Sequence, residues 1–161
     1  MEIREASTDD VDAIRSVAEA SWEHDYPDIL SRETVEEGFD DWYGGDRLTA
    51  EITNPKSFVH LAESDEIAGF VHAIIDGDGG VFMRLYVHPD HRERGIGSEL
   101  FEHAKSKLVE YDVERLRAMV LAENALGNEF YRTLGFENTS QEVTIIGGEE
   151  FEENTYELDV E

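Results

Sequence analysis

The chain has 161 residues, of which 39 are acidic and 13 basic, and it contains no cysteine. This length fits a single domain spanning residues 1–161, with enough buried surface for a full core. The absence of cysteine excludes disulfides and zinc sites built on thiolates. A formal net charge of −26 repels the phosphates of nucleic acids and anionic lipids, so we expect neither as a partner.

The sequence predicts a cytoplasmic protein. The first ten residues, "MEIREASTDD", lack the basic start and apolar run of a secretory signal. No apolar stretch reaches the length needed to span a membrane. The excess of acidic residues favours a halophilic protein from a high-salt cytoplasm over a generic acidic surface, because salt screens self-repulsion. Neither interpretation identifies a substrate.

The first third of the chain predicts a strand and two or more helices. "EIREAS" is a short strand, and Ser7 or Thr8 then caps a helix with acidic residues in its first turn. The apolar positions of this helix follow helical spacing and are Val11, Ile14, Val17, Ala18 and Trp22. Residues 31–43 predict a second, weaker helix with Ser31 as its cap, and residues 46–53 another turn.

Three strands follow in quick succession: "SFVHLAE", "EIAGFVHAIID" and "GVFMRLYVH". The segments "SDE" and "DGDGG" separate them and are typical of hairpin connections. These three strands are therefore expected to be antiparallel neighbours.

The second half predicts a helix over 98–111, a buried strand "RLRAMVLA" and a short helix capped by Asn124 and stopped by Gly135. Two final strands, "EVTIIGG" and "NTYELDV", join around the acidic "EEFEE", which is expected to be a solvated turn. The order of elements predicts an α/β (α+β) fold with one mixed, mostly antiparallel sheet of about seven strands flanked by helices.

A glycine-containing loop after the third of these strands carries the clearest functional signal. In "HPDHRERGIGSELF", two arginines and two glycines stand at the start of the helix. A helix start offers unpaired N–H groups and a partial positive charge, and glycine lets the backbone approach a ligand closely. These features predict a local phosphate site on an otherwise negative chain.

Two common phosphate motifs do not fit this loop. The dinucleotide fingerprint needs a third glycine where Leu100 stands, and the nucleotide P-loop needs a Gly-Lys-Ser/Thr triplet that is absent. What is left is Arg-x-x-Gly-x-Gly, from Arg92 to Gly97. Spacing alone does not separate this motif from a bare glycine turn before a helix.

The segment "RLYVHPDHRERGIGSELFEHA" resembles the coenzyme A-binding segment of GCN5-related N-acetyltransferases (GNATs), which carry Arg/Gln-x-x-Gly-x-Gly/Ala between the fourth strand and the next helix. Farther along, "ENALGNEFYRTLGF" resembles the family's Asn…Phe-Tyr…Leu-Gly-Phe segment. The order of elements fits the family along nearly the whole chain. Ser21–Trp22 and the final strands more loosely resemble members that acetylate polyamines or protein amino termini.

The resemblance implies a GNAT-like acyl-CoA N-acyltransferase fold and a set of site residues. Strand edges at Leu85, Tyr86 and Val87 would hold the pantetheine arm, which enters a gap between the fourth and fifth strands. Backbone N–H groups would hold the pyrophosphate at Arg92, Arg94, Gly95, Gly97 and Ser98. Asn124 would bond the arm, Arg132 would reach the ribose phosphate, and Tyr131 would be catalytic beside the sulfur.

The sequence departs from the family pattern at two positions. Many members have a catalytic glutamate early in the fourth strand, where this chain has Val81. The general base is therefore not named by the sequence. Gly127 stands where the family often has alanine, and glycine inside a helix costs about 1 kcal/mol relative to alanine.

Other candidate residues have competing structural interpretations. His88 and His91 form an H-x-x-H pair, but a proline lies between them and no third ligand is evident, so no metal is expected. His72 either faces the substrate or belongs to the core. The acceptor candidates that follow the first helix are Glu23, His24, Asp25 and Tyr26, each of which is otherwise ordinary surface. Trp22, Trp42 and Tyr43 are expected in the core or in a lid.

The expected activity is transfer of an acetyl group from acetyl-CoA, used as co-substrate, to a primary amine by direct attack in a ternary complex. The acceptor is either a small amine such as a polyamine or a protein amino terminus. The alternative from another class is a non-catalytic acyl-CoA-binding sensor, which the missing glutamate favours and Tyr131 disfavours. The sequence leaves open whether the acyl group is longer than acetyl and whether the chain forms a homodimer.

Overall fold

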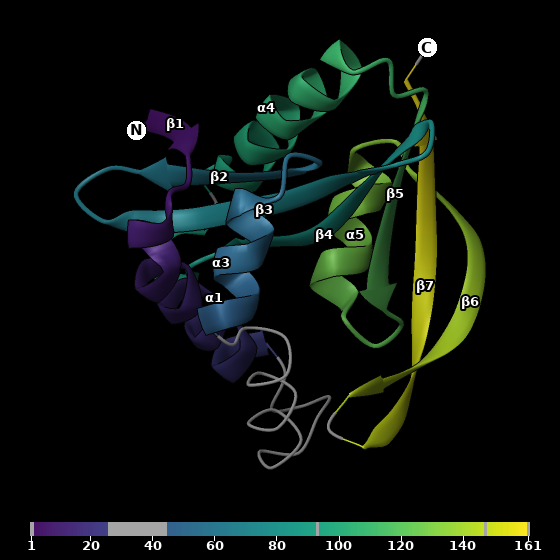
Figure 1. Cartoon of the computed structure of the whole chain (residues 1–161). Helices are drawn as coiled ribbons and strands as arrows, with labels where there is room; N and C mark the ends of the chain where they lie inside the picture. Colours follow the sequence, from purple (N-terminus) through teal and green to yellow (C-terminus); the bar gives the residue numbers. More distant parts are fainter. Residues whose placement is uncertain (1, 26–44, 93, 147, 161) are drawn as a thin grey trace.

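The computed structural model describes residues 2–25, 45–92, 94–146 and 148–160. Within this part, seven strands form one sheet in the order β1-β2-β3-β4-β5-β7-β6 (Figure 1). The strands are β1 (Glu2–Glu5), β2 (Ser57–Glu63), β3 (Ile67–Asp76), β4 (Gly79–Val87), β5 (Arg115–Leu121), β6 (Glu137–Ile146) and β7 (Glu149–Asp159). The β4–β5 pair is parallel, and the other neighbouring pairs are antiparallel. The predicted fold class is confirmed.

Helices cover both faces of this sheet. They are the 3₁₀ helix η1 (Thr8–Asp10), α1 (Val11–Asp25), α3 (Gly45–Thr53), the 3₁₀ helix η2 (Pro89–His91), α4 (Ile96–Glu110) and α5 (Ala125–Thr133). The turn predicted over 46–53 is wrong, because α3 is a nine-residue helix there with Leu48 buried and Ile52 packed behind it. The helix predicted over 31–43 lies outside the described residues. None of the described helices combines the length and the apolarity that a membrane span requires.

Two hydrophobic clusters lie on opposite faces of the sheet. One includes Leu100, Phe101 and Leu108 of α4, together with Tyr131 of α5. The other joins α1 and α3 to the sheet around the buried Trp22 and Phe70. In Figure 1, α1 and α3 lie on one side of β2 and β3, and α4 lies on the other. Burial of five α4 side chains fixes the start of this helix, at roughly 1.5–3 kcal/mol for each large one.

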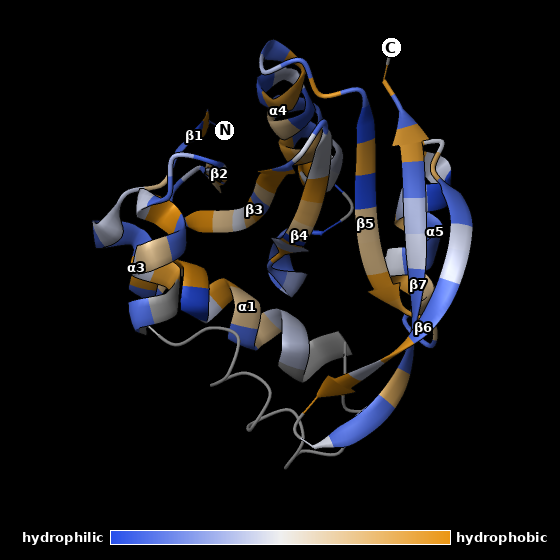
Figure 2. Ribbon diagram, turned by 45° about the vertical axis from the view of Figure 1, so that its right-hand side comes forward, coloured by the Kyte–Doolittle hydropathy of each residue, from blue (hydrophilic) through white to orange (hydrophobic). Residues whose placement is uncertain are grey.

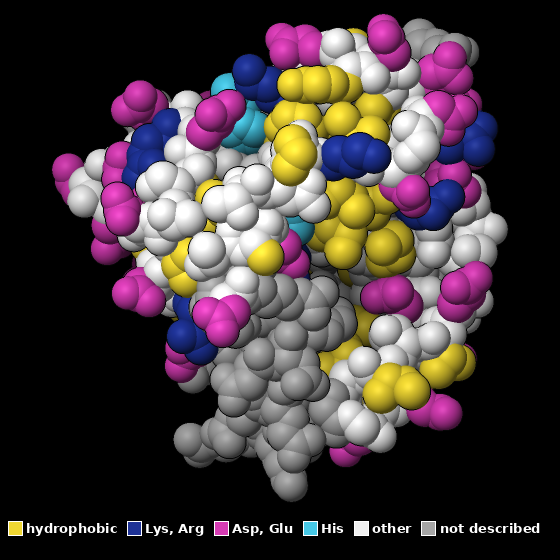
Figure 3. Space-filling model, viewed as in Figure 1, with side chains coloured by type: hydrophobic (Ala, Val, Ile, Leu, Met, Phe, Trp, Pro, Cys, Tyr) yellow, Lys and Arg dark blue, Asp and Glu magenta, His cyan; other side chains and the backbone are white. Residues whose placement is uncertain are grey.

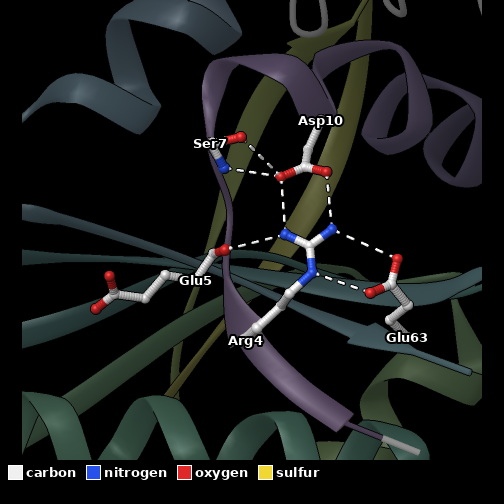
Figure 4. Close-up of polar contacts among 5 residues, drawn as sticks. All are labelled: Arg4, Glu5, Ser7, Asp10 and Glu63. Atoms are coloured by element: carbon white, nitrogen blue, oxygen red, sulfur yellow. Dashed lines mark hydrogen bonds and ion pairs between the residues drawn. The ribbon is translucent and has the colours of Figure 1, made fainter.

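An arginine fastens the first strand to its neighbours (Figure 4). Arg4 of β1 donates two hydrogen bonds to Asp10 at 2.9 and 3.0 Å, and its Nε donates to Glu63 of β2 at 3.1 Å. The Ser7 N–H also donates to Asp10 at 2.8 Å, which closes the first helical turn. The Arg4 hydrogen bonds are the main reason that the pKa of Asp10 falls to about 2.

The C-terminal hairpin corrects one prediction. The acidic "EEFEE" was expected to be a turn, but it forms the first half of β7, and the connection instead follows Ile146 and includes Gly148 at φ +80°. Phe151 packs against the α1 cluster while the acids beside it stay exposed or half-exposed. Figure 2 shows how hydrophilic β6 and β7 are. Successive side chains of a strand point to opposite faces, so β7, between β5 and β6, accommodates these charges as well as a turn does.

Candidate active site

The sheet opens between β4 and β5. The two strands pair over only four positions, from Gly79↔Arg115 to Phe82↔Ala118. Beyond this point β4 continues to Val87 and β5 to Leu121 without pairing to each other, and they diverge in Figure 1. The expected separation is therefore present. The edge of β4 that faces the gap offers backbone groups that β5 does not use, along a segment that includes Leu85, Tyr86 and Val87.

The glycine loop brings its predicted residues together where α4 begins. Gly95 is the N-cap in the left-handed conformation, at φ +76°, which glycine adopts without strain. Ile96 starts the helix and is buried, whereas Ser98 is exposed. The first-turn N–H groups and the positive end of the helix dipole are thus held in place by a well-packed helix.

The two arginines of this loop also fix its path. Arg92 donates from Nε to the Val87 carbonyl at 3.0 Å and so ties the loop to the end of β4. Arg94 is exposed, with its Nη1 3.4 Å from Nδ1 of His91. His91 Nε2 lies 2.7 Å from a carboxylate oxygen of Glu66, and this bond lowers the pKa of Glu66. The chain from Glu66 through His91 orients the Arg94 side chain beside the helix start.

The two histidines of the H-x-x-H pair, His88 and His91, each make a hydrogen bond to a protein group. His88 Nδ1 accepts from the Asp90 N–H at 3.1 Å, while His91 contacts Glu66. Across the described ranges, no group of three histidine, aspartate or glutamate side chains is arranged to hold a metal ion.

Tyr131 lies in a buried aromatic wall. Its ring stacks on Tyr156 with centroids 6.2 Å apart and meets Phe130 and Phe136 edge-on at 5.2 and 5.3 Å. Burial, and secondarily the charge of Tyr86, raise the pKa of Tyr131 well above its usual value of 10. The phenol is therefore protonated at all physiological pH values and can act as a hydrogen-bond donor.

The predicted helix cap is confirmed at Asn124. Its Oδ1 accepts from the Gly127 N–H at 3.0 Å. A Cβ at Gly127 would lie 2.9 Å from both the Asn124 amide nitrogen and a Val120 methyl group. Glycine at 127 is thus required by the close packing of this cap against β5, which the sequence does not reveal. Arg132 is exposed on the same helix.

Sequence reasoning missed a second asparagine, Asn128. This residue is 2 % exposed, and its amide donates to the carbonyls of Leu121, Ala122 and Asn124. Its Oδ1 accepts from Asn154 at 2.9 Å and from the Tyr156 hydroxyl at 2.6 Å. Asn128 therefore joins the end of β5, α5 and β7 on one side of the gap. Its place four residues after the capping asparagine is the only signal that the sequence offers.

The opposite wall is formed by α1 and β4. Trp22 is buried, which confirms the prediction of a core position over a lid. Its Nε1 donates to the Tyr86 hydroxyl at 3.2 Å. The Ser21 hydroxyl lies 3.4 Å from the Val87 carbonyl oxygen. Val81 is buried and offers no acid or base. Glu23, His24 and Asp25 continue the backbone of α1, but their side chains, like Tyr26, Trp42 and Tyr43, lie outside the described residues.

His72 is a core residue, 3 % exposed. Both of its ring nitrogens are within hydrogen-bond distance of protein groups, Ser57 at 2.7 Å and Arg84 at 3.0 Å. Direct contact of this imidazole with a substrate is therefore disfavoured.

Figure 3 shows hydrophobic side chains gathered in the middle of the face seen in Figure 1, with acidic side chains around them.

Comparison with known proteins gives the family. The profile described as "Acetyltransferase (GNAT) domain" matches residues 27–147. A spermidine N(1)-acetyltransferase of Thermoplasma acidophilum is 28% identical over 84% of this chain and 88% of its own length. An uncharacterized N-acetyltransferase of Lactobacillus delbrueckii is 30% identical over 63% of this chain and 64% of its own.

Solved structures of N-acetyltransferases share the fold of this chain. The PaiA N-acetyltransferase of Thermoplasma acidophilum, in complex with coenzyme A, superposes with a TM-score of 0.88 at 26% identity, over 99% of this chain and 98% of its own. The ribosomal-protein-S18-alanine N-acetyltransferase of Escherichia coli shares the fold at 18% identity and a TM-score of 0.74, over 98% and 92% of the two chains. The divided sheet, the glycine loop at the start of α4 and the matching family profile together show that this chain belongs to the GNAT acetyltransferase family.

Proposed function

We propose that the protein transfers an acetyl group from acetyl-CoA to a primary amine, and that its acceptor is a polyamine. The observation that carries this proposal is the gap between β4 and β5. The start of α4 lies beside Leu85 of β4, and Tyr131 of α5, the helix that follows β5, is buried in the core cluster that includes α4. These are the elements needed to bind an acyl-CoA by its phosphates and to expose its thioester.

Coenzyme A lies in the gap with its pyrophosphate at the start of α4. Backbone N–H groups of the loop bind the phosphates, at Arg92, Arg94, Gly95, Gly97 and Ser98. The arm runs along Leu85, Tyr86 and Val87 and reaches Asn124, and Arg132 lies near the ribose phosphate. A net charge of −26 repels a ligand that is itself an anion. The local helix dipole and arginine side chains offset this repulsion at the one place where the phosphates sit.

The chemistry is a direct attack. The neutral amine nitrogen adds to the thioester carbonyl carbon, the C–N bond forms, and the C–S bond breaks as the tetrahedral intermediate collapses. A backbone N–H of β4 stabilises the oxyanion. An ammonium with a pKa near 10.4 must first lose a proton, at a cost of roughly 4–5 kcal/mol at pH 7. A water chain or a carboxylate on the acceptor side accepts this proton, since Val81 cannot.

Tyr131 stabilises the departing sulfur. A model thiol has a pKa near 8.5, so full proton transfer from a tyrosine of pKa about 10 is already uphill. The raised pKa of Tyr131 makes that transfer less favourable still. Tyr131 therefore acts mainly by donating a hydrogen bond to the thiolate, which later takes its proton from water.

A polyamine is the acceptor that the chain's charge suits best. A long-range negative field attracts a polycation and raises its local concentration. The similarity to a spermidine acetyltransferase along most of both chains supports the same class. The likeness to an enzyme that acetylates a protein amino terminus is at the level of the fold, at 18% identity.

Release of free thiol from acetyl-CoA tests the proposal. The acceptors are spermidine, spermine, a monoamine of matched length and a short peptide with a free amino terminus. We expect kcat/KM to be highest for the polyamines. A preference for the peptide would contradict the acceptor class. Coenzyme A binding by calorimetry without turnover on any amine would identify a non-catalytic acyl-CoA-binding protein instead.

A further inference from the structure

Four polar side chains from four elements meet on the α3 side of β4. Arg84 of β4 donates from Nη1 to Glu51 of α3 and, at 3.0 Å, to Nδ1 of His72 on β3. His72 Nε2 lies 2.7 Å from the hydroxyl of Ser57 on β2. Arg84 and His72 are 5 % and 3 % exposed. This group, called here the Arg84 network, is not used by the acetyl-transfer chemistry derived above.

The hydrogen bonds fix the tautomer of His72. A guanidinium can only donate, so Nδ1 of His72 accepts from Arg84 and carries no proton. The ring proton then lies on Nε2 and is donated to Ser57. A hydrolytic Ser-His-Glu triad needs the reverse arrangement, with Nδ1–H facing the carboxylate and Nε2 accepting from serine. Nδ1 of His72 is 3.6 Å from the Glu51 carboxylate and closer, at 3.0 Å, to Arg84. The contacts therefore favour a role in holding structure over a second nucleophilic site.

Arg84 follows a bulge in β4. The pairing with β3 passes from His72↔Arg84 to Ala73↔Phe82, so Met83 is an extra residue. Phe82 consequently packs against Phe101 of α4, with ring centroids 5.0 Å apart, while Arg84 bonds to α3 on the other face. A bulge bends its strand and re-aims the backbone groups next to it.

The bulge lies where the gap opens. Phe82↔Ala118 is the last β4–β5 pair, and Met83 is the next residue. Every backbone group that β4 offers to the gap therefore follows the bulge. The residue that fixes the chain directly after it is Arg84, held from α3 by Glu51 and across the sheet by His72.

We propose that the Arg84 network positions the backbone N–H groups of β4 that meet the thioester, so that Glu51, His72 and Arg84 are positioning residues for acetyl transfer. This inference rests on the proposed function for the placement of the thioester. A purely stabilising role explains the network poorly, because a buried ion pair is often no better for stability than well-packed apolar residues. Such a pair does fix geometry, because the hydrogen bonds of Arg84 to Glu51 of α3 and to His72 of β3 hold its side chain from two sides.

The first test removes both charges together. The double variant Glu51→Leu/Arg84→Met removes both charges of the described ion pair, and we expect it to fold with a Tm near that of the parent. We expect kcat to fall at least tenfold while the Kd for coenzyme A, measured by calorimetry, stays within threefold. The control is Arg4→Met, which removes an arginine bound to Asp10 and Glu63 at β1. It is expected to lower Tm and leave kcat unchanged.

The second test keeps both charges and changes the histidine. His72→Gln can still accept from Arg84 and donate towards Ser57, whereas His72→Leu can do neither. We expect His72→Gln to retain most of kcat and His72→Leu to lose it, with amide shifts at residues 83–86 in NMR spectra of His72→Leu alone. This pair decides the matter if the double variant does not fold.

Variants that keep kcat within threefold of the parent, or glutamine and leucine variants with equal losses, would overturn the positioning role. Equal loss of kcat in Arg4→Met would also overturn it. A parent that turns over no amine would remove the proposed function and this inference together. A parent active on amines, with variants that match it, would remove the inference alone.

Discussion

Gly97 in the first turn of α4 faces the ring of Phe130 on α5. A Cβ built at residue 97 would lie 3.2 Å from that ring and 3.6 Å from a methyl group of Leu85 on β4. The two segments that resemble coenzyme A-binding motifs are thus in direct contact, on either side of the gap. The missing side chain at residue 97 lets α4 approach both α5 and β4, in addition to clearing the backbone for a phosphate.

Gly97→Val should weaken coenzyme A binding at least tenfold, about 1.4 kcal/mol. The new methyl groups would press on Phe130 and shift the wall of the gap, besides crowding the pyrophosphate. Calorimetric titration with coenzyme A measures the effect. Gly77→Ala is the control, because Gly77 has φ +65° in the β3–β4 turn with nothing near its Cα that a Cβ would meet. It should cost stability and leave affinity unchanged. Parent-like affinity in Gly97→Val would exclude the loop from the site.

Tyr131→Phe should lower turnover by about 10²–10³-fold, the range typical for loss of one preorganised hydrogen-bond donor, with acetyl-CoA binding little changed. The ring and its aromatic contacts stay, and only the donor to the sulfur is lost. Because the pKa of Tyr131 is raised, deprotonation of this residue should produce no alkaline limb in the parent's kcat profile up to about pH 10. Turnover within threefold of the parent, where chemistry is rate-limiting, would rule out Tyr131 as the donor.

Tyr156→Phe is the matched control for Tyr131. The Tyr156 ring stacks on Tyr131, and its hydroxyl donates to Asn128 at 2.6 Å inside the core. Removing this hydroxyl should lower the free energy of unfolding by about 1–2 kcal/mol and leave kcat nearly intact. Similar kcat losses in both variants would indicate that disturbance of the aromatic wall, rather than loss of a donor, is being measured.

Local patterns predicted much of the fold. Helical spacing identified α1 and α4, the segments "SDE" and "DGDGG" marked the three central strands, and Asn124 and Gly135 bounded α5 as expected. The errors fell where composition and tertiary context disagree. The "EEFEE" segment looks solvated by its charge, but pairing with β5 and β6 and the burial of Phe151 make it a strand.

The position of the glycine loop at a helix start was also predictable, because helix starts and glycine turns are local features. Gly95 caps α4 and Gly97 lies in its first turn. The supporting residues were not predictable, since the contacts that matter join distant parts of the sequence: Asn128 with Tyr156, Phe130 with Gly97 and Arg84 with His72. Such contacts arise from the sheet register, and a single sequence does not show them.

Stability should rise as molar KCl replaces dilute buffer. Like charges face each other across strands at Glu142↔Glu153 and Glu137↔Glu157. Such pairs are destabilising. At 1 M salt the Debye length falls to roughly 3 Å, so the ions screen this repulsion. Burial, and then Glu142, raise the pKa of Glu153. Glu142→Gln should therefore raise Tm in dilute buffer and have little effect in molar KCl. A parent Tm that is flat or falls with salt would contradict the halophilic interpretation.

His60 should make the fold sensitive to mild acid. This β2 residue is 1 % exposed, and its ring centroid lies 4.6 Å from that of His103 on α4. Its Nδ1 has no hydrogen-bond partner among the described residues. Burial first, and then the charges of His103 and Lys107, lower its pKa to about 4. The unfolded chain, with a histidine pKa near 6.5, binds a proton on His60 more readily than the folded protein does. The stability that depends on neutral His60 is therefore fully present above about pH 6.5 and is lost as the pH falls towards 4.

The size of this loss follows from the two pKa values. Between about pH 7.5 and pH 4.5, His60 should cost the native state about 2–3 kcal/mol. Urea unfolding of the parent and of His60→Leu across this range isolates the effect, because the many carboxylates contribute equally to both proteins. The leucine variant should lose less stability on acidification by that amount. His103→Gln removes the neighbouring charge but not the burial, so the loss should shrink without disappearing. Parallel pH profiles for the parent and His60→Leu would show that His60 is protonated as easily in the folded protein as in the unfolded chain.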